Sequence, residues 1–459
     1  MVFATIVALA TPVGEGGIGI IRLSGNQAKS IAAKIIQPLA LNSFAEATSR
    51  CFYYGWVVDP EDGTRIDEVL AVWMQAPTTY TGEEVVEIQG HGGMVPLTGI
   101  LRLCLREGAE PAEPGEFTKR AFFNGRIDLT QGEAVMDLIQ ARGEAAGRQA
   151  LRQLQGALGA RLKELSATLL QLLAMIEAWV DFSQEVGELD LHLLTTRWSG
   201  VQEDLNRFLR EAEQGKVIRQ GLTATIVGKP NVGKSSLLNA LLGEERALVS
   251  EYAGTTRDMI EEQINIAGLT IILRDTAGLS QSRDPLEQLG VARSQLAITQ
   301  TELLLIVLDG SAPLVSEEKE LLLALEHKPG IVVVNKNDLP LGLDLAELKQ
   351  LIPQETPLVF TAAPLAQGLT ELRQAMASQV MPLTFSGESP LLTRQRHVFG
   401  VSQALEQLRQ GEEGLAAGLP WDLIAIDLRA AWRALAEITG EVASGDIVEA
   451  IFRDFCIGK

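Results

Sequence analysis

The sequence predicts an α/β-and-α protein: an N-terminal α/β domain, a discontinuous helical domain, and a doubly wound α/β domain inserted between the two helical halves. Three observations predict this fold class. Short apolar runs punctuated by Gly, Pro and Thr come first, a long stretch without proline follows, and the next part alternates fully apolar runs with helical patterns. The 459 residues allow about three domains.

Residues 1–118 are expected to form the N-terminal domain. Strand-like runs lie at 5–10, 19–23, 68–74 and 85–89, and helical patterns lie at 28–36 and 95–106. The glycine-rich run 14–19 looks like a dinucleotide fingerprint, but β-like residues follow it instead of a helix. Because dinucleotide pyrophosphates bind at a helix N-terminus, we expect no NAD or FAD site here. His91, beside two glycines, is expected to be a turn residue.

The two halves of the helical domain are expected at 119–218 and 380–459. None of the 18 prolines falls in the first half, and a proline inside a helix costs about 3 kcal/mol. Apolar residues step by three or four from Leu151 to Val180, which predicts one long amphipathic helix in a helical core. Residues 421–459 also lack proline and are expected to be helical.

Residues 219–379 are expected to form the inserted domain. Its short, almost fully apolar runs are typical of strands that are buried on both faces of a mostly parallel sheet. These runs are 222–227, 270–273, 303–308, 331–334 and 358–360.

A phosphate-binding motif opens the inserted domain. Residues 228–235 read Gly-Lys-Pro-Asn-Val-Gly-Lys-Ser, a complete G-x-x-x-x-G-K-S sequence between an expected strand and an expected helix at 236–242. Backbone N–H groups of such a loop wrap phosphates, and the helix N-terminus adds partial positive charge. Lys234 is expected to reach the β- and γ-phosphates, and Ser235 is expected to ligate Mg²⁺.

Signals at the ends of later strands select GTP. Asp275 opens Asp-Thr-Ala-Gly, Asn335 opens Asn-Lys-Asn-Asp, and Thr361 opens Thr-Ala-Ala. The carboxylate of Asp338 can accept from both N1–H and N2–H₂ of guanine, a donor pair that adenine lacks. Thr256, within Gly-Thr-Thr-Arg-Asp, lies where a switch loop must reach Mg²⁺. The residues expected to contact GTP are Asn231, Val232, Gly233, Lys234, Ser235, Ser236, Ser250, Thr255, Thr256, Asp275, Thr276, Ala277, Gly278, Asn335, Lys336, Asp338, Thr361, Ala362 and Ala363.

With these motifs in this order, each at a strand end, the inserted domain resembles the Ras-like G domain of translation-factor-type GTPases. Ras-like proteins place a water-orienting Gln directly after D-x-x-G, but Leu279 occupies that position. Glu287 can orient water instead, with a solvated loop carboxylate as the alternative, and Asn231 can hold a monovalent cation. The expected catalytic residues are Glu287, Asn231, Lys234 and Arg257.

The chain is acidic, with 39 Lys plus Arg against 59 Asp plus Glu and a formal net charge of −20. This balance argues against nucleic-acid binding through broad positive charge. Cys51, Cys104 and Cys456 lie far apart, and the four histidines are not paired at metal-ligand spacing. Neither a signal peptide nor an apolar run long enough to cross a membrane is expected, so a cytoplasmic location is predicted.

Four further segments share a pattern that spans the chain. They are Thr-Ile-Val-Ala at 5–8 with 16–25, residues 81–93, residues 114–122, and the tail Phe-Cys-Ile-Gly-Lys at 455–459. Together they resemble the family of tRNA-modifying GTPases called MnmE or TrmE. The resemblance implies a homodimer with potassium-dependent GTP hydrolysis and a flavoprotein partner, MnmG, which alone carries FAD and NADH. It also implies that an aminomethyl-type group, such as carboxymethylaminomethyl, is added to C5 of the tRNA wobble uridine (U34). A 5-formyl- or 5,10-methylene-tetrahydrofolate supplies the one-carbon unit.

The resemblance also assigns residues to ligands. It implies that Ser235 and Thr256 bind Mg²⁺ and that Glu287 orients water. Potassium is implied to bind Asn231, Ser250, Tyr252 and Thr255. The implied folate residues are Arg22, Glu87, Arg126 and Lys459. Cys456 is either a chemically active thiol or inert packing.

A regulatory GTPase switch in ribosome assembly is the alternative function, because the G domain alone does not exclude it. The N-terminal domain and the Cys-Ile-Gly-Lys tail favour tRNA modification. A ribosome-assembly GTPase is expected to carry a basic RNA-binding appendage, which this sequence lacks.

Overall fold

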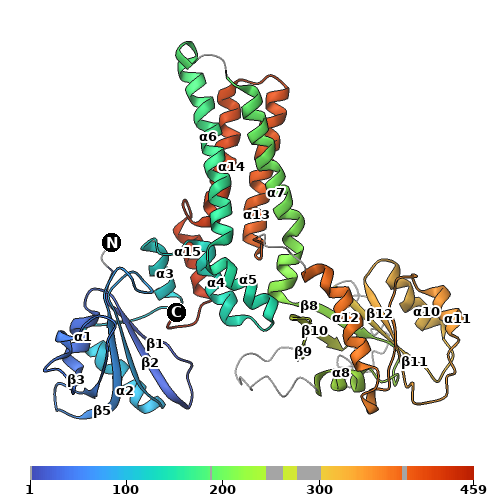
Figure 1. Cartoon of the computed structure of the whole chain (residues 1–459), viewed down its shortest axis with the longest axis horizontal. Helices are drawn as coiled ribbons and strands as arrows, with labels where there is room; N and C mark the ends of the chain where they lie inside the picture. The colour runs from blue at the N-terminus through green and yellow to red at the C-terminus, as the bar shows by residue number, and fades with distance from the viewer. Residues whose placement is uncertain (1–2, 187–188, 244–261, 276–300, 385–389) are drawn as a thin grey trace, which may run out of the picture. The chain divides into compact units, whose positions relative to one another are not determined.

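A computed structural model of the whole chain describes residues 3–186, 189–243, 262–275, 301–384 and 390–459 (Figure 1). Contacts divide the chain into two units. The first unit joins Met1–Met136, Gln153–Gln202 and Gly400–Lys459, and the second joins Asp137–Arg152 and Glu203–Phe399. The predicted fold class is confirmed: an N-terminal α/β domain, helices from separated stretches of chain, and an inserted doubly wound domain.

The N-terminal domain is built on a seven-stranded sheet within the described residues, in the order β3-β4-β5-β6-β2-β1-β7. The strands are β1 Ile6–Leu9, β2 Gly16–Ser24, β3 Ile36–Pro38, β4 Phe52–Val58, β5 Arg65–Met74, β6 Val85–Gly92 and β7 Glu110–Pro111. Neighbouring strands are antiparallel except β1 and β7. Helices α1 (Ala28–Ile35) and α2 (Met94–Arg106) bury Ile31 and Ile100 against the alternate strand residues that face the core. Burying one apolar face of each helix against the sheet is what stabilises this domain.

Two details of this domain bear on the sequence predictions. The glycine-rich run continues directly into β2, and no helix N-terminus follows it, as expected. His91 is a strand residue rather than a turn residue, because the pairing of β6 with β2 extends to Gly92. Its Nδ1 lies 2.6 Å from Oδ1 of Asp67, and the hydrogen bond to this carboxylate raises the pKa of His91.

The helical domain brings together stretches that are far apart in the sequence. Its helices are α3 Glu116–Phe123, α4 Leu129–Gln140, α5 Glu144–Leu154, α6 Ala157–Val186, α7 Leu191–Gln220, α13 Gln395–Ala416, α14 Trp421–Thr439 and α15 Gly445–Arg453. Figure 1 shows α6, α7, α13 and α14 side by side. The indole of Trp198 on α7 donates to the carbonyl of Leu408 on α13, at 3.2 Å.

The single helix predicted from Leu151 to Val180 is wrong, because the chain breaks between α5 and α6. Gly156 adopts φ +89°, a left-handed conformation that commonly ends helices. The leucine stripe continues across this break, so periodicity alone did not locate it. Gly440, at φ +92°, likewise divides the C-terminal stretch into α14 and α15.

One helical segment of the described residues, Ala157–Phe182, is long and apolar enough to cross a membrane by length and composition. Leu162, Leu169 and Ile176 of its stripe are fully buried, whereas Val180 at the end of the stripe is exposed. The core helix of a bundle passes the same test, so this segment is weak evidence for a membrane span.

The inserted domain holds a six-stranded sheet within the described residues, in the order β13-β12-β11-β8-β10-β9. The strands are β8 Leu222–Val227, β9 Glu262–Ile266, β10 Leu269–Asp275, β11 Leu303–Asp309, β12 Gly330–Asn335 and β13 Leu358–Phe360. All neighbours are parallel except β9 and β10. Helices α8 (Lys234–Gly243) and α12 (Leu369–Thr384) pack on one face, and α10 (Ser316–Leu323) and α11 (Leu345–Leu351) pack on the other. Strand β8 lies between β10 and β11, at the switch point where doubly wound sheets bind ligands.

Candidate functional site

The loop between β8 and α8 has the backbone of a phosphate cradle. Gly228, Asn231 and Gly233 adopt φ values of +153°, +64° and +98°. A Cβ on Gly233 would lie 2.2 Å from Nδ2 of Asn335, and one on Gly228 would lie 2.3 Å from the carbonyl oxygen of Val307. Both positions therefore require glycine, whereas asparagine tolerates the left-handed region at 231.

The Lys234 side chain stabilises this loop through hydrogen bonds to its backbone. Its Nζ donates to the carbonyls of Gly228, at 2.8 Å, and Lys229, at 2.7 Å, and its side chain is buried. Ser235 and Ser236 are exposed in the first turn of α8. The residues present therefore fit a triphosphate, with an ammonium in the loop and hydroxyls and N–H groups at a helix N-terminus.

Asn335 joins the phosphate loop to the two loops predicted to bind guanine. Its Nδ2 donates to the carbonyl of Val232, at 2.8 Å. Its Oδ1 accepts from Oγ1 of Thr361, at 3.1 Å, and from the backbone N–H of Ala363, at 3.2 Å. The side chain is fully buried, so it fixes the relative positions of three loops rather than facing solvent.

The rest of the Asn-Lys-Asn-Asp loop is held by an ion pair. Lys336, at φ +62°, places Nζ 2.6 Å from Oδ2 of Asp309. Burial raises the pKa of Asp309, but hydrogen bonds from Lys336 and Ser311 outweigh it, so the pKa lies below its ordinary value. Asp338 is exposed just beyond the carboxyl end of β12.

Several predicted residues lie outside the described residues: Ser250, Tyr252, Thr255, Thr256, Arg257, Thr276, Ala277, Gly278 and Glu287. Asp275 is the last residue of β10, paired with Ile226 of β8. It therefore ends its strand beside the start of the phosphate loop. Ala362 and Ala363 are buried in the turn after β13, next to Asn335.

A second polar cluster, in the first unit, brings the four implied folate residues together. Nε of Arg22, on β2, donates to Oε1 of Glu87, on β6, at 2.8 Å, because these two residues are paired across the strands. Nη1 of Arg22 also donates to the carbonyl of Gly458, at 3.3 Å, which holds the C-terminal tail beside the sheet. Burial and the nearby charge of Arg22 lower the pKa of the Lys459 ammonium.

Tyr80 lies at the centre of this cluster, and sequence reasoning missed it. The cations of Arg22, Arg126 and Lys459 lie 5.9, 5.2 and 6.0 Å from its ring centroid. Arg126 also donates to the carbonyl of Tyr80, at 2.7 Å. Burial raises the pKa of Tyr80. Its place directly before the 81–93 segment was the available signal, but nothing in the sequence marks it as the residue on which three cations converge.

The cysteines differ in their surroundings. Burial raises the pKa of the Cys104 thiol to about 12, so it is an inert core residue. Cys456 is exposed in the C-terminal tail, and its carbonyl accepts from the N–H of Gly115 at 3.4 Å. In the described part of the chain, no group of three or more His, Cys, Asp or Glu residues is placed to hold a metal ion.

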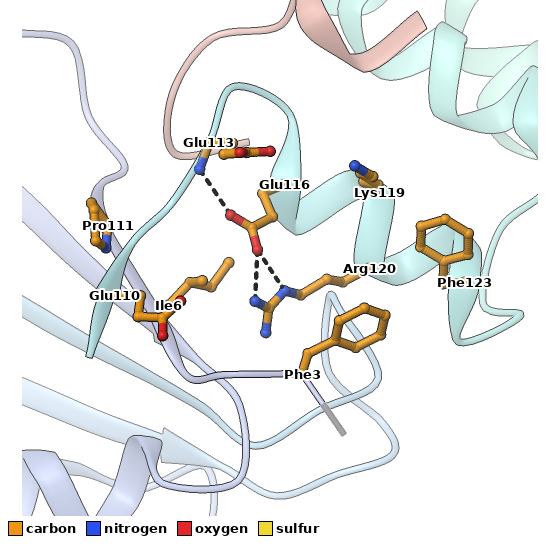
Figure 2. Close-up of a pocket in the computed structure, with 9 residues that line it drawn as sticks. All are labelled: Phe3, Ile6, Glu110, Pro111, Glu113, Glu116, Lys119, Arg120 and Phe123. Atoms are coloured by element: carbon orange, nitrogen blue, oxygen red, sulfur yellow. Dashed lines mark hydrogen bonds and ion pairs between the residues drawn. The ribbon is translucent and has the colours of Figure 1, made fainter. Parts of the chain in front are cut away.

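A pocket of about 300 Å³ in the first unit, lined partly by α3, contains none of the predicted site residues (Figure 2). Arg120 lines it, almost fully buried, and donates to Glu116, Glu83 and the carbonyl of Ala4. These bonds satisfy the guanidinium within the fold, so the arginine has a structural role.

Comparisons with known proteins decide the family. A model described as the MnmE helical domain matches residues 129–456, and one described as the GTP-binding protein TrmE N-terminus matches residues 5–126. The chain belongs to the MnmE family. Proteins named tRNA modification GTPase MnmE from Levilactobacillus brevis and Lactiplantibacillus plantarum are each 43% identical over 100% of this chain, covering 98% and 99% of their own lengths. The MnmE of Geobacillus kaustophilus is 42% identical over 100% of this chain and 99% of its own. Among solved structures, Era from Aquifex aeolicus shows 27% identity with a TM-score of 0.28, over 40% of this chain and 66% of that one.

Membership in the MnmE family agrees with the expected resemblance along the whole chain. The matched N-terminal region contains Arg22, Glu87 and Arg126, whereas Lys459 lies beyond the helical match, at the end of the tail. The MnmE relatives cover the chain essentially from end to end, so the phosphate loop and the cluster around Tyr80 both lie within the shared sequence.

Proposed function

We propose that this chain is a GTP hydrolase that acts in tRNA modification, as the names of its relatives state. With a flavoprotein partner, MnmG, it adds an aminomethyl-type group to C5 of the wobble uridine, using a tetrahydrofolate one-carbon donor. FAD and NADH belong to the partner. The protein acts as a cytoplasmic homodimer, with domains at 1–118, 119–218, 219–379 and 380–459.

One observation carries the folate part of this proposal. Arg22, Glu87, Arg126 and Lys459 come from separate parts of the sequence and meet around Tyr80. A carboxylate such as Glu87 suits the donor-rich edge of a pterin, and the cations suit the carboxylates of its glutamyl tail. A set of unrelated surface ion pairs has no reason to converge on one ring.

The hydrolytic part rests on the phosphate loop. Lys234 stabilises the charge of the transferred phosphoryl group, and Ser235 and Thr256 are the Mg²⁺ ligands. The hydrogen bonds from Nζ of Lys234 to the carbonyls of Gly228 and Lys229 support this role, because they keep the ammonium within the loop. Bound magnesium supplies charge neutralisation between the phosphates. Glu287 orients the attacking water, and Asn231 holds potassium with Ser250, Tyr252 and Thr255. Arg257 is the further basic residue at the reacting phosphates.

Exchange of K⁺ for Na⁺ tests this function directly. In KCl, the chain with MnmG, tRNA, a folate donor and GTP is expected to hydrolyse GTP and to form modified uridine. In NaCl, hydrolysis is expected to slow by about tenfold or more, roughly 1.4 kcal/mol of barrier, because the smaller Na⁺ does not fill the potassium site and the cation charge at the phosphates is lost. Modified uridine is measured by mass spectrometry of digested tRNA. Hydrolysis without any modification in KCl would instead favour the ribosome-assembly switch.

Asp338→Asn is expected to change the base preference. The amide replaces one of two acceptors with a donor, so it clashes with N2–H₂ of guanine and matches the 2-oxo group of xanthine. We expect the affinity for GTP to fall by about 100-fold, or roughly 2.7 kcal/mol, and XTP to bind more tightly than GTP. Titration with fluorescent GDP and competition by XTP measure both. An unchanged preference would contradict guanine recognition by Asp338.

A further inference from the structure

The turn between α4 and α5 is hydrogen-bonded to the β9–β10 hairpin of the G domain. The backbone N–H of Ala145 donates to the carbonyl of Gly268, at 2.9 Å, and Nδ2 of Asn265 donates to the carbonyl of Arg142, at 3.0 Å. Nη1 of Arg142 donates in turn to Gln263. Residues 137–152 accordingly group by their contacts with residues 203–399, which include the G domain, although the sequence places them within the helical domain. We call residues 142–145 the clasp.

The clasp is fitted closely to the hairpin. Gly143 is buried, and a Cβ there would lie 2.8 Å from the carbonyl oxygen of Gly268 and 3.0 Å from Oγ1 of Thr270. Ala267 and Gly268 form the two-residue turn between β9 and β10, both with positive φ, at +52° and +81°. A turn of this kind fixes the hairpin register, so the clasp holds a defined backbone feature.

The hairpin connects two segments that the sequence predicts to contact GTP, one of which contains the expected Mg²⁺ ligand Thr256. Strand β9 begins at Glu262, soon after the Gly-Thr-Thr-Arg-Asp segment, and β10 ends at Asp275, the first residue of Asp-Thr-Ala-Gly. Strands β9 and β10 are paired from Glu262–Leu273 to Ile266–Leu269, so the backbone is hydrogen-bonded from the strand ends to the turn.

The N-terminal end of the 137–152 segment is held by ion pairs. Oδ1 of Asp137, near the end of α4, lies 2.8 Å from Nε of Arg219 and 2.7 Å from Nη2 of Arg394. The Asp137 side chain is almost fully buried. Helix α4 begins in the first unit and ends in the second, so the segment from Asp137 to the clasp is continuous in sequence with the first unit and contacts the hairpin by hydrogen bonds.

We propose that the clasp is a positioning element that passes the nucleotide state of the hairpin through α4 to the first unit. This inference rests on the proposed function, because it assigns a route between GTP hydrolysis and tRNA modification. The hairpin turn lies about seven residues from Asp275, roughly 20 Å along β10 at ~3.3 Å per residue. Loosening the clasp therefore uncouples the two activities without disturbing the hydrolytic residues.

Gly143→Ala and Asn265→Ala test the proposal. The methyl added at position 143 pushes the clasp from the hairpin. The second change removes the hydrogen bond from Nδ2 of Asn265 to the carbonyl of Arg142 at an exposed position, so we expect it to preserve the fold. Both variants are expected to hydrolyse GTP at close to the wild-type rate and to form modified uridine about tenfold more slowly, within the usual range of coupling between sites. Gly147→Ala is the matched control, because its Cβ makes only an ordinary 3.9 Å contact. It should match the wild type in both assays.

Hydrogen exchange provides a readout that a purely structural role would not change. In the wild type, exchange of the peptide containing Ala145 is expected to differ between GDP and a non-hydrolysable GTP analogue. This difference should disappear in both clasp variants. Wild-type modification rates in both variants, or equal exchange in the two nucleotide states, would overturn the proposal. A wild type that hydrolyses no GTP or modifies no tRNA would instead contradict the proposed function.

Discussion

Asn335→Ala is expected to lower GTP affinity by about 100-fold, roughly 2.7 kcal/mol, and to destabilise the G domain. The change removes three hydrogen bonds and leaves the carbonyl of Val232 and the N–H of Ala363 without this partner. Each buried polar group left unsatisfied costs about 1–3 kcal/mol, so we expect unfolding to require roughly 2–4 kcal/mol less. The loss of affinity follows because the phosphate loop and the guanine loops no longer hold one arrangement.

Asn337→Ala is the control for this prediction. Asn337 lies in the same loop, but its side chain is exposed, and its backbone N–H donates to the carbonyl of Thr361 whatever the side chain is. We expect its affinity and stability to stay close to the wild type. Calorimetric titration with GDP and urea unfolding measure both quantities. Equal behaviour of the two variants would show that Asn335 does not organise the site.

The phosphate loop was predictable because its geometry is local. The spacing of Gly228, Gly233 and Lys234 fixes the loop, and the flanking strand and helix supply the remaining constraint. Asn335 was predicted to contact GTP. Its hydrogen bonds to the phosphate loop and to the loop after β13 were not predicted. These bonds depend on the parallel order of β12, β11 and β8, which no short window of sequence contains.

The cluster around Tyr80 shows the opposite case. Arg22, Glu87, Arg126 and Lys459 were assigned through family resemblance, and no spacing in the sequence relates positions so far apart. Only the pairing of β2 with β6 and the return of the C-terminal tail bring them together. The missed helix break at Gly156 has a related cause, since a left-handed glycine interrupts the backbone without interrupting the apolar pattern.

Arg22→Ala is expected to weaken the binding of 5-formyltetrahydrofolate by about 100-fold, roughly 2.7 kcal/mol. The guanidinium both pairs with Glu87 and donates to the carbonyl of Gly458, so its loss removes a cation and releases the tail that carries Lys459. Hydrogen bonds to charged groups contribute about 1.5–3 kcal/mol each, which supports an effect of this size. Arg22→Lys keeps the charge but loses the bidentate guanidinium donor, so it should recover only part of the affinity that Arg22→Ala loses.

The matched control is Arg65→Ala in the same domain. Arg65 is exposed and lies 4.6 Å over the ring of Trp56. It begins β5, seven residues before Val72, which is the residue paired with Glu87, so its truncation removes a similar side chain without touching the cluster. Calorimetric titration of both variants and the wild type separates a specific loss from a general one. Tight binding by Arg22→Ala would remove the folate site from this cluster. Equal weakening by Arg65→Ala would show that the ligand responds to net charge, because screened surface charges act without a defined geometry.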